Sequence, residues 1–357
     1  MEGCETGQGA RGRNARGRAR RHQCAQGAAA PGAAVLDHAA PRRPWPAARC
    51  GLAGLGIPAC PARHGAGARA AALHEDRRDQ RRGRSLTAVA FDTHSHLQDR
   101  KIRDDFRGVI ERAEAAGVAG IALCGYDGPS NELALSLAAN EPGVFPTVGF
   151  HPHEADEVSQ AMLADLETLA TLPEVVAVGE IGLDFYRGLA EEANQRRLID
   201  AQLAIALRVG KPVSVHSRGA EDAAREHLAP YAEAARTAGL EIPGVMHCFG
   251  GSLEQAMSYV ELGFMVSIAG PVTYPKNDDA RRLAAGLPAR SLVIETDSPY
   301  LPPQAMRGKL NEPALILHTA QAVAAARGES LESLLSLTTA NAERLFRVRV
   351  PARAGAV

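Results

Sequence analysis

Short apolar runs alternate with longer amphipathic stretches from Leu86 almost to the end of the chain. Short runs rich in Val, Ile and Leu are typical of buried strands, and apolar residues spaced three to four apart are typical of helices. The predicted strands are 89–91, 118–123, 144–148, 175–178, 212–215, 244–246, 264–268 and 292–294. The predicted helices are 103–116, 131–139, 160–169, 191–208, 220–238, 253–261, 278–285, 313–327 and 331–346.

This alternation predicts parallel strands joined by crossover helices, and therefore an α/β fold. Eight repeats in about 260 residues match the size of a closed (β/α)₈ TIM barrel, which we place at residues 86–350. A doubly wound open sheet is the alternative. It would be expected to carry a Gly-rich phosphate turn after its first strand, where this chain has the histidines His94 and His96.

Residues 1–85 differ from the rest, being rich in Arg, Ala, Gly and Pro without sustained periodicity. Such a segment cannot bury enough apolar surface to offset its ordering entropy, so we predict a disordered N-terminal extension. Three interpretations stay open. The segment is a basic tail that touches nucleic acid, an organelle transit segment, or translated sequence upstream of the true start.

The charge is unevenly divided along the chain. Residues 1–86 hold 16 Arg, no Lys and 6 Asp or Glu, a net charge of +10, so the remainder carries −11 because the whole chain carries −1. An acidic body offers no broad basic surface to a polyanion. A phosphate substrate would therefore depend on bound cations and a few local Arg or Lys residues.

The predicted compartment is the cytoplasm. Only Cys124 and Cys248 lie in the predicted barrel, and each follows an apolar run, as buried thiols do. We find neither a signal peptide nor an apolar run of about 18 residues that could span a membrane. No obligate protein partner is evident in the sequence.

The candidate chemistry begins where the first predicted strand ends, with His94 and His96. Residues i and i+2 of a strand point to the same side, so the two imidazoles are expected to lie together. Neutral imidazole is a good ligand for zinc and for most first-row metals. A lone His-x-His pair is as often two solvated histidines on a loop.

Further metal-ligand types follow other predicted strands, at the end of a barrel where active sites form. They are Glu180, His216, His247 and Asp297. Six such groups exceed what one catalytic zinc takes, so we predict two divalent cations, with zinc, manganese, nickel and magnesium all open. Glu180 is well placed to bridge them, and Asp297 is the natural proton acceptor from an activated water. Alternatively, Asp297 is a salt-bridged structural acid.

Eight motifs between residues 91 and 346 carry a family resemblance. They are FDTHSH (91–96), VGFHPH (148–153), VGEIGLDFY (178–186), PVSVHSR (212–218), MHCFGGS (246–252), ETDSPYL (295–301), RGKLNEP (307–313) and TTANAERLF (338–346). In this order they resemble the TatD family of metal-dependent deoxyribonucleases, a branch of the amidohydrolase-like barrels.

The resemblance implies that His94, His96, Glu180 and Asp297 hold one metal and that Glu180, His216 and His247 hold the second. It also implies hydrolysis of DNA phosphodiesters, often from the 3′ end towards the 5′ end. One departure is visible: Gly219 stands where the family usually has an acidic residue. This departure puts in doubt a contact that supports His216, and leaves the ligands intact.

Four residues are weaker candidates for substrate binding: His151, His153, Arg307 and Lys309. The two histidines contact a substrate phosphate or belong to a loop stiffened by proline, and Arg307 binds phosphate or pins its own loop to a carboxylate. Three aromatic residues flank the ligands and either stack an unpaired base or pack in the core. These are Phe185, Tyr186 and Phe249.

DNA is the expected substrate, in the form of single-stranded ends, because the acidic body lacks a duplex-binding basic face. One alternative is hydrolysis of a small amide, lactone or phosphoester on the same barrel. Glu180 speaks against it, because the resemblance places a modified lysine there in lactonase-like relatives. The other alternative is a basic-tailed nucleic-acid-binding scaffold with an inert barrel. A scaffold has no need of six convergent ligands.

Overall fold

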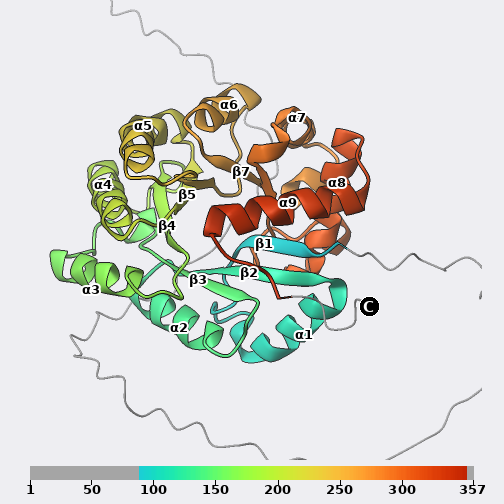
Figure 1. Cartoon of the computed structure of the whole chain (residues 1–357), viewed down its shortest axis with the longest axis horizontal. Helices are drawn as coiled ribbons and strands as arrows, with labels where there is room; N and C mark the ends of the chain where they lie inside the picture. The colour runs from blue at the N-terminus through green and yellow to red at the C-terminus, as the bar shows by residue number, and fades with distance from the viewer. Residues whose placement is uncertain (1–87, 352–357) are drawn as a thin grey trace, which may run out of the picture. The chain divides into compact units, whose positions relative to one another are not determined.

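The computed structural model describes residues 88–351, and within them eight parallel strands form one sheet. Each strand pairs with the next in chain order, and the helices surround the ring of strands (Figure 1). The strands are β1 Ala90–Ser95, β2 Val118–Cys124, β3 Val144–Val148, β4 Ala177–Asp184, β5 Val213–Arg218, β6 Gly244–Met246, β7 Met265–Ile268 and β8 Leu292–Ile294.

The sheet closes where the last strand meets the first. The amide of Asp297 donates to the carbonyl of His94 over 3.0 Å, and the amide of His96 donates to the carbonyl of Ser298 over 2.7 Å. A closed ring leaves no free sheet edge. The predicted (β/α)₈ barrel is therefore confirmed, and the open doubly wound sheet is wrong.

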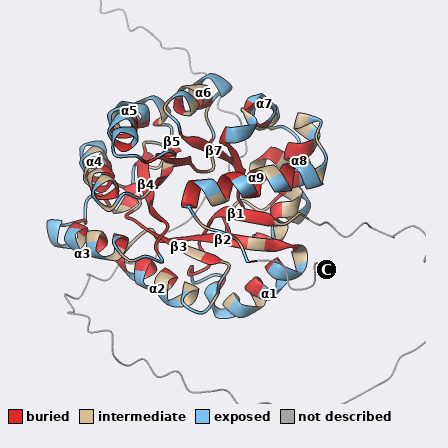
Figure 2. Ribbon diagram, viewed as in Figure 1, coloured by how far each residue is buried: buried red, intermediate tan, exposed pale blue. Residues whose placement is uncertain are grey.

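Helices pack around the strands with their apolar faces inward, so that buried residues line the inner side of each helix (Figure 2). The α-helices are α1 Phe106–Ala116, α2 Gly128–Ala138, α3 Gln160–Ala170, α4 Glu192–Val209, α5 Glu221–Thr237, α6 Leu253–Glu261, α7 Asp278–Gly286, α8 Ile316–Arg327 and α9 Leu331–Phe346. The short 3₁₀ helices are η1 Arg103–Asp105, η2 Pro152–Glu154, η3 Gly270–Thr273, η4 Ala289–Ser291, η5 Gln304–Met306 and η6 Pro313–Leu315.

Helix α9 crosses the barrel at the amino ends of its strands (Figure 1). Its Thr339 donates to the carbonyl of Val89, just before β1 begins. The ring of Phe346 stacks on that of Phe91, with centroids 5.7 Å apart, and both are buried. This end of the barrel is filled by apolar side chains, which leaves the carboxyl end for the polar residues.

Three strands run several residues further than their apolar patterns predicted. Strand β1 continues to Ser95, β4 to Asp184 and β5 to Arg218. The candidate ligands His94, Glu180 and His216 therefore lie inside strands instead of following them. Every residue of β1 and β4 is buried.

The predicted disordered extension, residues 1–85, lies outside the described residues, as does its boundary with the barrel. Within residues 88–351, no helix combines the length and the apolar character needed to cross a membrane.

Candidate metal centre

The six predicted ligands lie together at the carboxyl end of the barrel. Strand β1 carries His94, His96 directly follows β1, and β4 carries Glu180. Strand β5 carries His216, His247 directly follows β6, and Asp297 stands three residues after the end of β8. All are buried except His216, which is partly exposed. Residues more than 200 positions apart along the chain are thus brought to one buried cluster, as predicted for His94, His96, Glu180, His216, His247 and Asp297.

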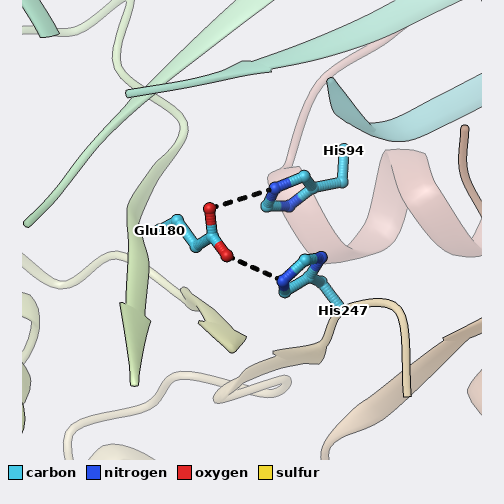
Figure 3. A group of neighbouring side chains, drawn as sticks. All are labelled: His94, Glu180 and His247. Atoms are coloured by element: carbon cyan, nitrogen blue, oxygen red, sulfur yellow. Dashed lines mark ion pairs between the residues drawn. The ribbon is translucent and has the colours of Figure 1, made fainter. Parts of the chain in front are cut away.

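The carboxylate of Glu180 stands at the middle of this cluster. Its Oε2 lies 3.6 Å from Nε2 of His94 and 3.4 Å from Nε2 of His96. Its Oε1 lies 3.0 Å from Nδ1 of His216 and 2.8 Å from Nε2 of His247. Figure 3 shows one oxygen directed to His94 and the other to His247. Each oxygen therefore faces its own pair of imidazoles.

Two of these imidazoles are fixed by carbonyl or hydroxyl oxygen on their far side. Nδ1 of His96 donates to the carbonyl of Cys124 over 2.8 Å. Nδ1 of His94 lies 3.3 Å from the hydroxyl of Ser214, which we assign as its acceptor. With the proton on Nδ1, the lone pair of each Nε2 points towards Glu180.

The other two imidazoles are fixed by carboxylates. Nδ1 of His247 donates to Glu295 over 3.3 Å, and Nε2 of His216 donates to Asp184 over 3.3 Å. Both carboxylate side chains are buried. A carboxylate behind a histidine is the arrangement that orients metal-ligating imidazoles and raises their basicity.

The distance between the facing nitrogens of each imidazole pair shows whether the residues suit a cation. Nε2 of His94 and Nε2 of His96 are 3.1 Å apart, and Nδ1 of His216 and Nε2 of His247 are 3.2 Å apart. Two lone pairs at this distance repel each other unless a proton or a cation lies between them. The donor set of imidazole and carboxylate suits a divalent metal, so the residues present fit the predicted group.

Charge inside the cluster is set by Glu180. Burial alone would raise its pKa, but His151, His247 and His216 hold that pKa well below its usual range. Burial lowers the pKa of His94 to about 4, with a further lowering by His247, so this ring stays neutral. Although burial disfavours it, Glu180 raises the pKa of His247 well above its usual value. A proton on Nε2 of His247 would therefore compete with a cation for the lone pair of that nitrogen.

Asp297 lies beside the His94 and His96 pair, with Oδ1 3.7 Å from Nε2 of His96. Its backbone adopts φ 56° and donates to β1, which holds the side chain against the cluster. Burial raises the pKa of Asp297 to about 7, although His247 and His96 oppose the rise. A carboxylate with a pKa near neutrality can take up and release a proton at neutral pH.

The predicted substrate residues His151 and His153 lie at the edge of the cluster. Nε2 of His151 is 3.5 Å from Oε1 of Glu180, while its Nδ1 accepts the amide of His153 over 3.2 Å. A neutral His151 therefore carries its proton on Nε2 and is a donor aimed at the centre. His153 is buried, and its Nε2 lies 2.9 Å from Asp184.

Arg307 and Lys309 lie on the loop between β8 and α8, where both are exposed. The guanidinium of Arg307 lies over the ring of Tyr274, 4.9 Å from its centroid. No ion pair joins either residue to the six ligands within residues 88–351. Their role towards phosphate remains a prediction.

The sequence analysis did not select two carboxylates that contact the ligand histidines, Asp184 and Glu295. Asp184 stands four residues after Glu180, so in a strand longer than its apolar run it shares the same face. Glu295 stands two residues before Asp297, in a motif from which only the second acid was chosen. The replacement of an acid by Gly219 put in doubt a contact that supports His216. Asp184 makes such a contact.

Comparison with known proteins agrees with this geometry. A family model described as TatD related DNase matches residues 91–347. The chain belongs to the TatD family. The TatD family model runs from the second residue of β1 past β8 and includes all six candidate ligands. The protein is therefore a metal-dependent hydrolase, an enzyme that acts on ester bonds.

Individual TatD family members match the same part of the chain. The "Uncharacterized metal-dependent hydrolase YabD" of Bacillus subtilis is 34% identical over 261 residues, covering 73% of this chain and 100% of that protein. The "3'-5' ssDNA/RNA exonuclease TatD" of Klebsiella pneumoniae is 36% identical over 266 residues, covering 73% and 98%. The crystal structure of the TatD homologue YJJV from Escherichia coli matches with a TM-score of 0.69 at 31% identity, covering 74% of this chain and 100% of that one.

Proposed function

We propose that this enzyme hydrolyses phosphodiester bonds of single-stranded DNA, removing nucleotides from the 3′ end, with the help of two divalent cations. The observation that carries the proposal is the position of Glu180, whose two oxygens face two separate imidazole pairs. A carboxylate in this position suits a bridge between two metals.

In this proposal, the first cation is held by His94, His96, Glu180 and Asp297, and the second by Glu180, His216 and His247. Magnesium, manganese, zinc and nickel are the candidates, since all accept nitrogen or carboxylate ligands. When bound, such cations lower the pKa of water and neutralise charge on the phosphate oxygens.

In the proposed reaction, side chains of the protein accept the proton of the attacking water and bind the phosphate. Asp297 takes the proton of the attacking water on its carboxylate, a role that suits its raised pKa of about 7. His151 donates from Nε2 to a non-bridging phosphate oxygen, a role supported by its fixed Nδ1. Asp184 holds His216 and His153 in orientation throughout.

The choice of single-stranded nucleic acid rests on two supports. Relatives from Klebsiella pneumoniae and Erwinia billingiae are named as 3'-5' ssDNA/RNA exonucleases, at 36% and 37% identity. The part of the chain after residue 86 carries a net charge of −11, which disfavours the broad phosphate contacts of duplex binding.

A polarity-resolved assay of the metal-loaded enzyme tests the proposal. Single-stranded DNA labelled at the 5′ end should shorten stepwise, and the same strand labelled at the 3′ end should lose its label first. Duplex DNA, RNA, a lactone and an amide serve as competing substrates. Faster turnover of the lactone or amide than of DNA would overturn the proposal in favour of an amidohydrolase. Metal-independent DNA binding without turnover would favour the scaffold.

A further inference from the structure

An exposed aromatic ring and an unpaired guanidinium lie together beside the metal centre. Tyr186, on the loop after β4, is 66% exposed. Among the large hydrophobic side chains of residues 88–351, its exposed fraction is the highest. The guanidinium of Arg218, the last residue of β5, lies over this ring at 4.2 Å from its centroid. We call Tyr186 and Arg218 the rim pair.

Strand pairing places the rim pair directly above the ligands. Asp184 and Arg218 are register partners in the β4–β5 ladder, and the amide of Phe185 donates to the carbonyl of Arg218 over 3.1 Å. Arg218 follows His216 by two positions, so its side chain leaves the strand on the same side, about 7 Å further towards the mouth of the barrel. The backbone amide of Tyr186 donates to Asp184, which ties this loop to the ligands while the Tyr186 ring itself stays exposed.

Arg218 has no carboxylate to neutralise it. Within residues 88–351 its guanidinium makes no ion pair and no side-chain hydrogen bond, and its contact is with the ring of Tyr186. The neighbouring position, where the resemblance implies an acid, is Gly219, which adopts φ +62° and lies against the backbone and Cβ of Tyr186. A half-buried Arg with all its donors available suits a phosphate.

The other two aromatic candidates near the ligands are occupied by packing. Phe249 is 6% exposed and packs edge-on against Tyr259. Phe185 is half-buried, packs against the core and is covered by Arg196. Of the three residues that sequence analysis left open between stacking and packing, Tyr186 alone offers an open face.

We propose that the rim pair is a nucleotide-binding subsite: one base of the substrate strand stacks on the open face of Tyr186, and Arg218 binds an adjacent phosphate. This proposal rests on the proposed single-strand nuclease function and names the residues that hold the strand outside the metal centre. Aromatic stacking with a nearby Arg is the usual way in which proteins grip single strands without reading their sequence.

Abasic substitution combined with mutation tests the subsite. In metal-loaded wild-type enzyme, an oligonucleotide abasic at one position near its 3′ end should show a KM about tenfold higher, the effect of losing one base–aromatic stack. Tyr186→Ala should raise the KM of the intact strand to the same extent, with kcat unchanged. In this variant the abasic strand and the intact strand should have the same KM. Tyr186→Trp should restore both. Arg218→Ala should raise KM and reduce the salt dependence of KM by about one phosphate contact.

Two control variants separate the subsite from general effects. Leu189→Ala removes a second exposed side chain from the same loop, and Arg282→Ala removes an exposed guanidinium on α7 that pairs with Asp279. Both should behave as wild type. An abasic penalty that persists in Tyr186→Ala, in an enzyme that cleaves DNA, overturns the subsite alone. A wild-type enzyme that cleaves no single-stranded DNA overturns the proposed function and the subsite with it.

Discussion

Asp184 accepts a hydrogen bond from Nε2 of His216 over 3.3 Å, and this bond decides which nitrogen of His216 faces Glu180. The same carboxylate oxygen lies 2.9 Å from Nε2 of His153. Its second oxygen accepts the backbone amides of Tyr186 and Arg187. These contacts hold the pKa of Asp184 well below its usual range, against the effect of burial. One carboxylate therefore joins the metal centre to the loop that carries the rim pair.

Asp184→Asn is expected to weaken cation binding by about 10- to 100-fold, because His216 loses the charged partner that orients its ring. Activity titrated in metal buffers should recover at high metal concentration. The matched control is Asp200→Asn, which alters another Asp–His pair, with His227 at 2.6 Å, on the outer helices. Equal metal affinity in the two variants would contradict an orienting role for Asp184.

Glu180→Gln is expected to lower hydrolysis about a thousandfold or more, since several kcal/mol of charge stabilisation depend on the cations. The metal content per chain, measured by mass spectrometry, should fall at both positions because both imidazole pairs face this carboxylate. Glu167→Gln, on the exposed face of α3, is the control and should keep its metal. Unchanged metal content in Glu180→Gln would remove the bridge from the mechanism.

Asp297→Asn is expected to lower kcat by about 10²- to 10⁴-fold, the range for losing a general base. The cation at His216 and His247 should be retained, because Asp297 contacts the other imidazole pair. Single-turnover hydrolysis together with metal analysis separates the two effects. If single-turnover rates match those of wild type, Asp297 is a structural acid and the proton leaves by another route.

Removal of metal with a chelator is expected to abolish hydrolysis reversibly and to lower the melting temperature. A ligand at a hundred times its Kd stabilises the folded state by about 2.7 kcal/mol. Scanning calorimetry before chelation, after chelation and after metal is restored checks both effects. Full activity after exhaustive chelation would exclude the cations from the reaction.

Phe91→Ala is expected to destabilise the barrel by about 3–5 kcal/mol, the usual cost of emptying a buried aromatic site. Phe91 packs between Phe145 and Phe346 at the amino end, with centroids 5.5 and 5.7 Å away. The lower midpoint should appear in urea unfolding, while kcat/KM under folding conditions stays near that of wild type. A large loss of kcat/KM without a stability change would show that the two ends of the barrel are coupled.

The alternation of apolar runs predicted every described strand and the closed barrel, because a parallel strand buried on both faces leaves a continuous apolar signature. The six ligands were predictable for a related reason: each is a polar residue placed where such a run should end. Glu180 and His247 stand out in this way even without a family resemblance.

The supporting residues were harder to predict because their role is defined only by contacts across strands. Asp184 looks like an ordinary strand residue until β4 and β5 are aligned in register. Ser214 looks like one until the closed barrel brings it to His94 of β1. Phe185, Tyr186 and Phe249 look equivalent in sequence. Burial alone separates them, and burial depends on how the loops after β4 and β6 fold back on the barrel.

The junction between β1 and β8 has a consequence for how the enzyme matures. His94 lies in β1 and Asp297 in the segment that follows β8, and the backbone amide of Asp297 donates to the carbonyl of His94. A nascent chain that has released only its first seven strands from the ribosome lacks Asp297, and the edge of β1 that does not pair with β2 stays unpaired. The proposed first cation site, which takes His94 and His96 from one end of the chain and Asp297 from the other, would then be complete only once the ring has closed.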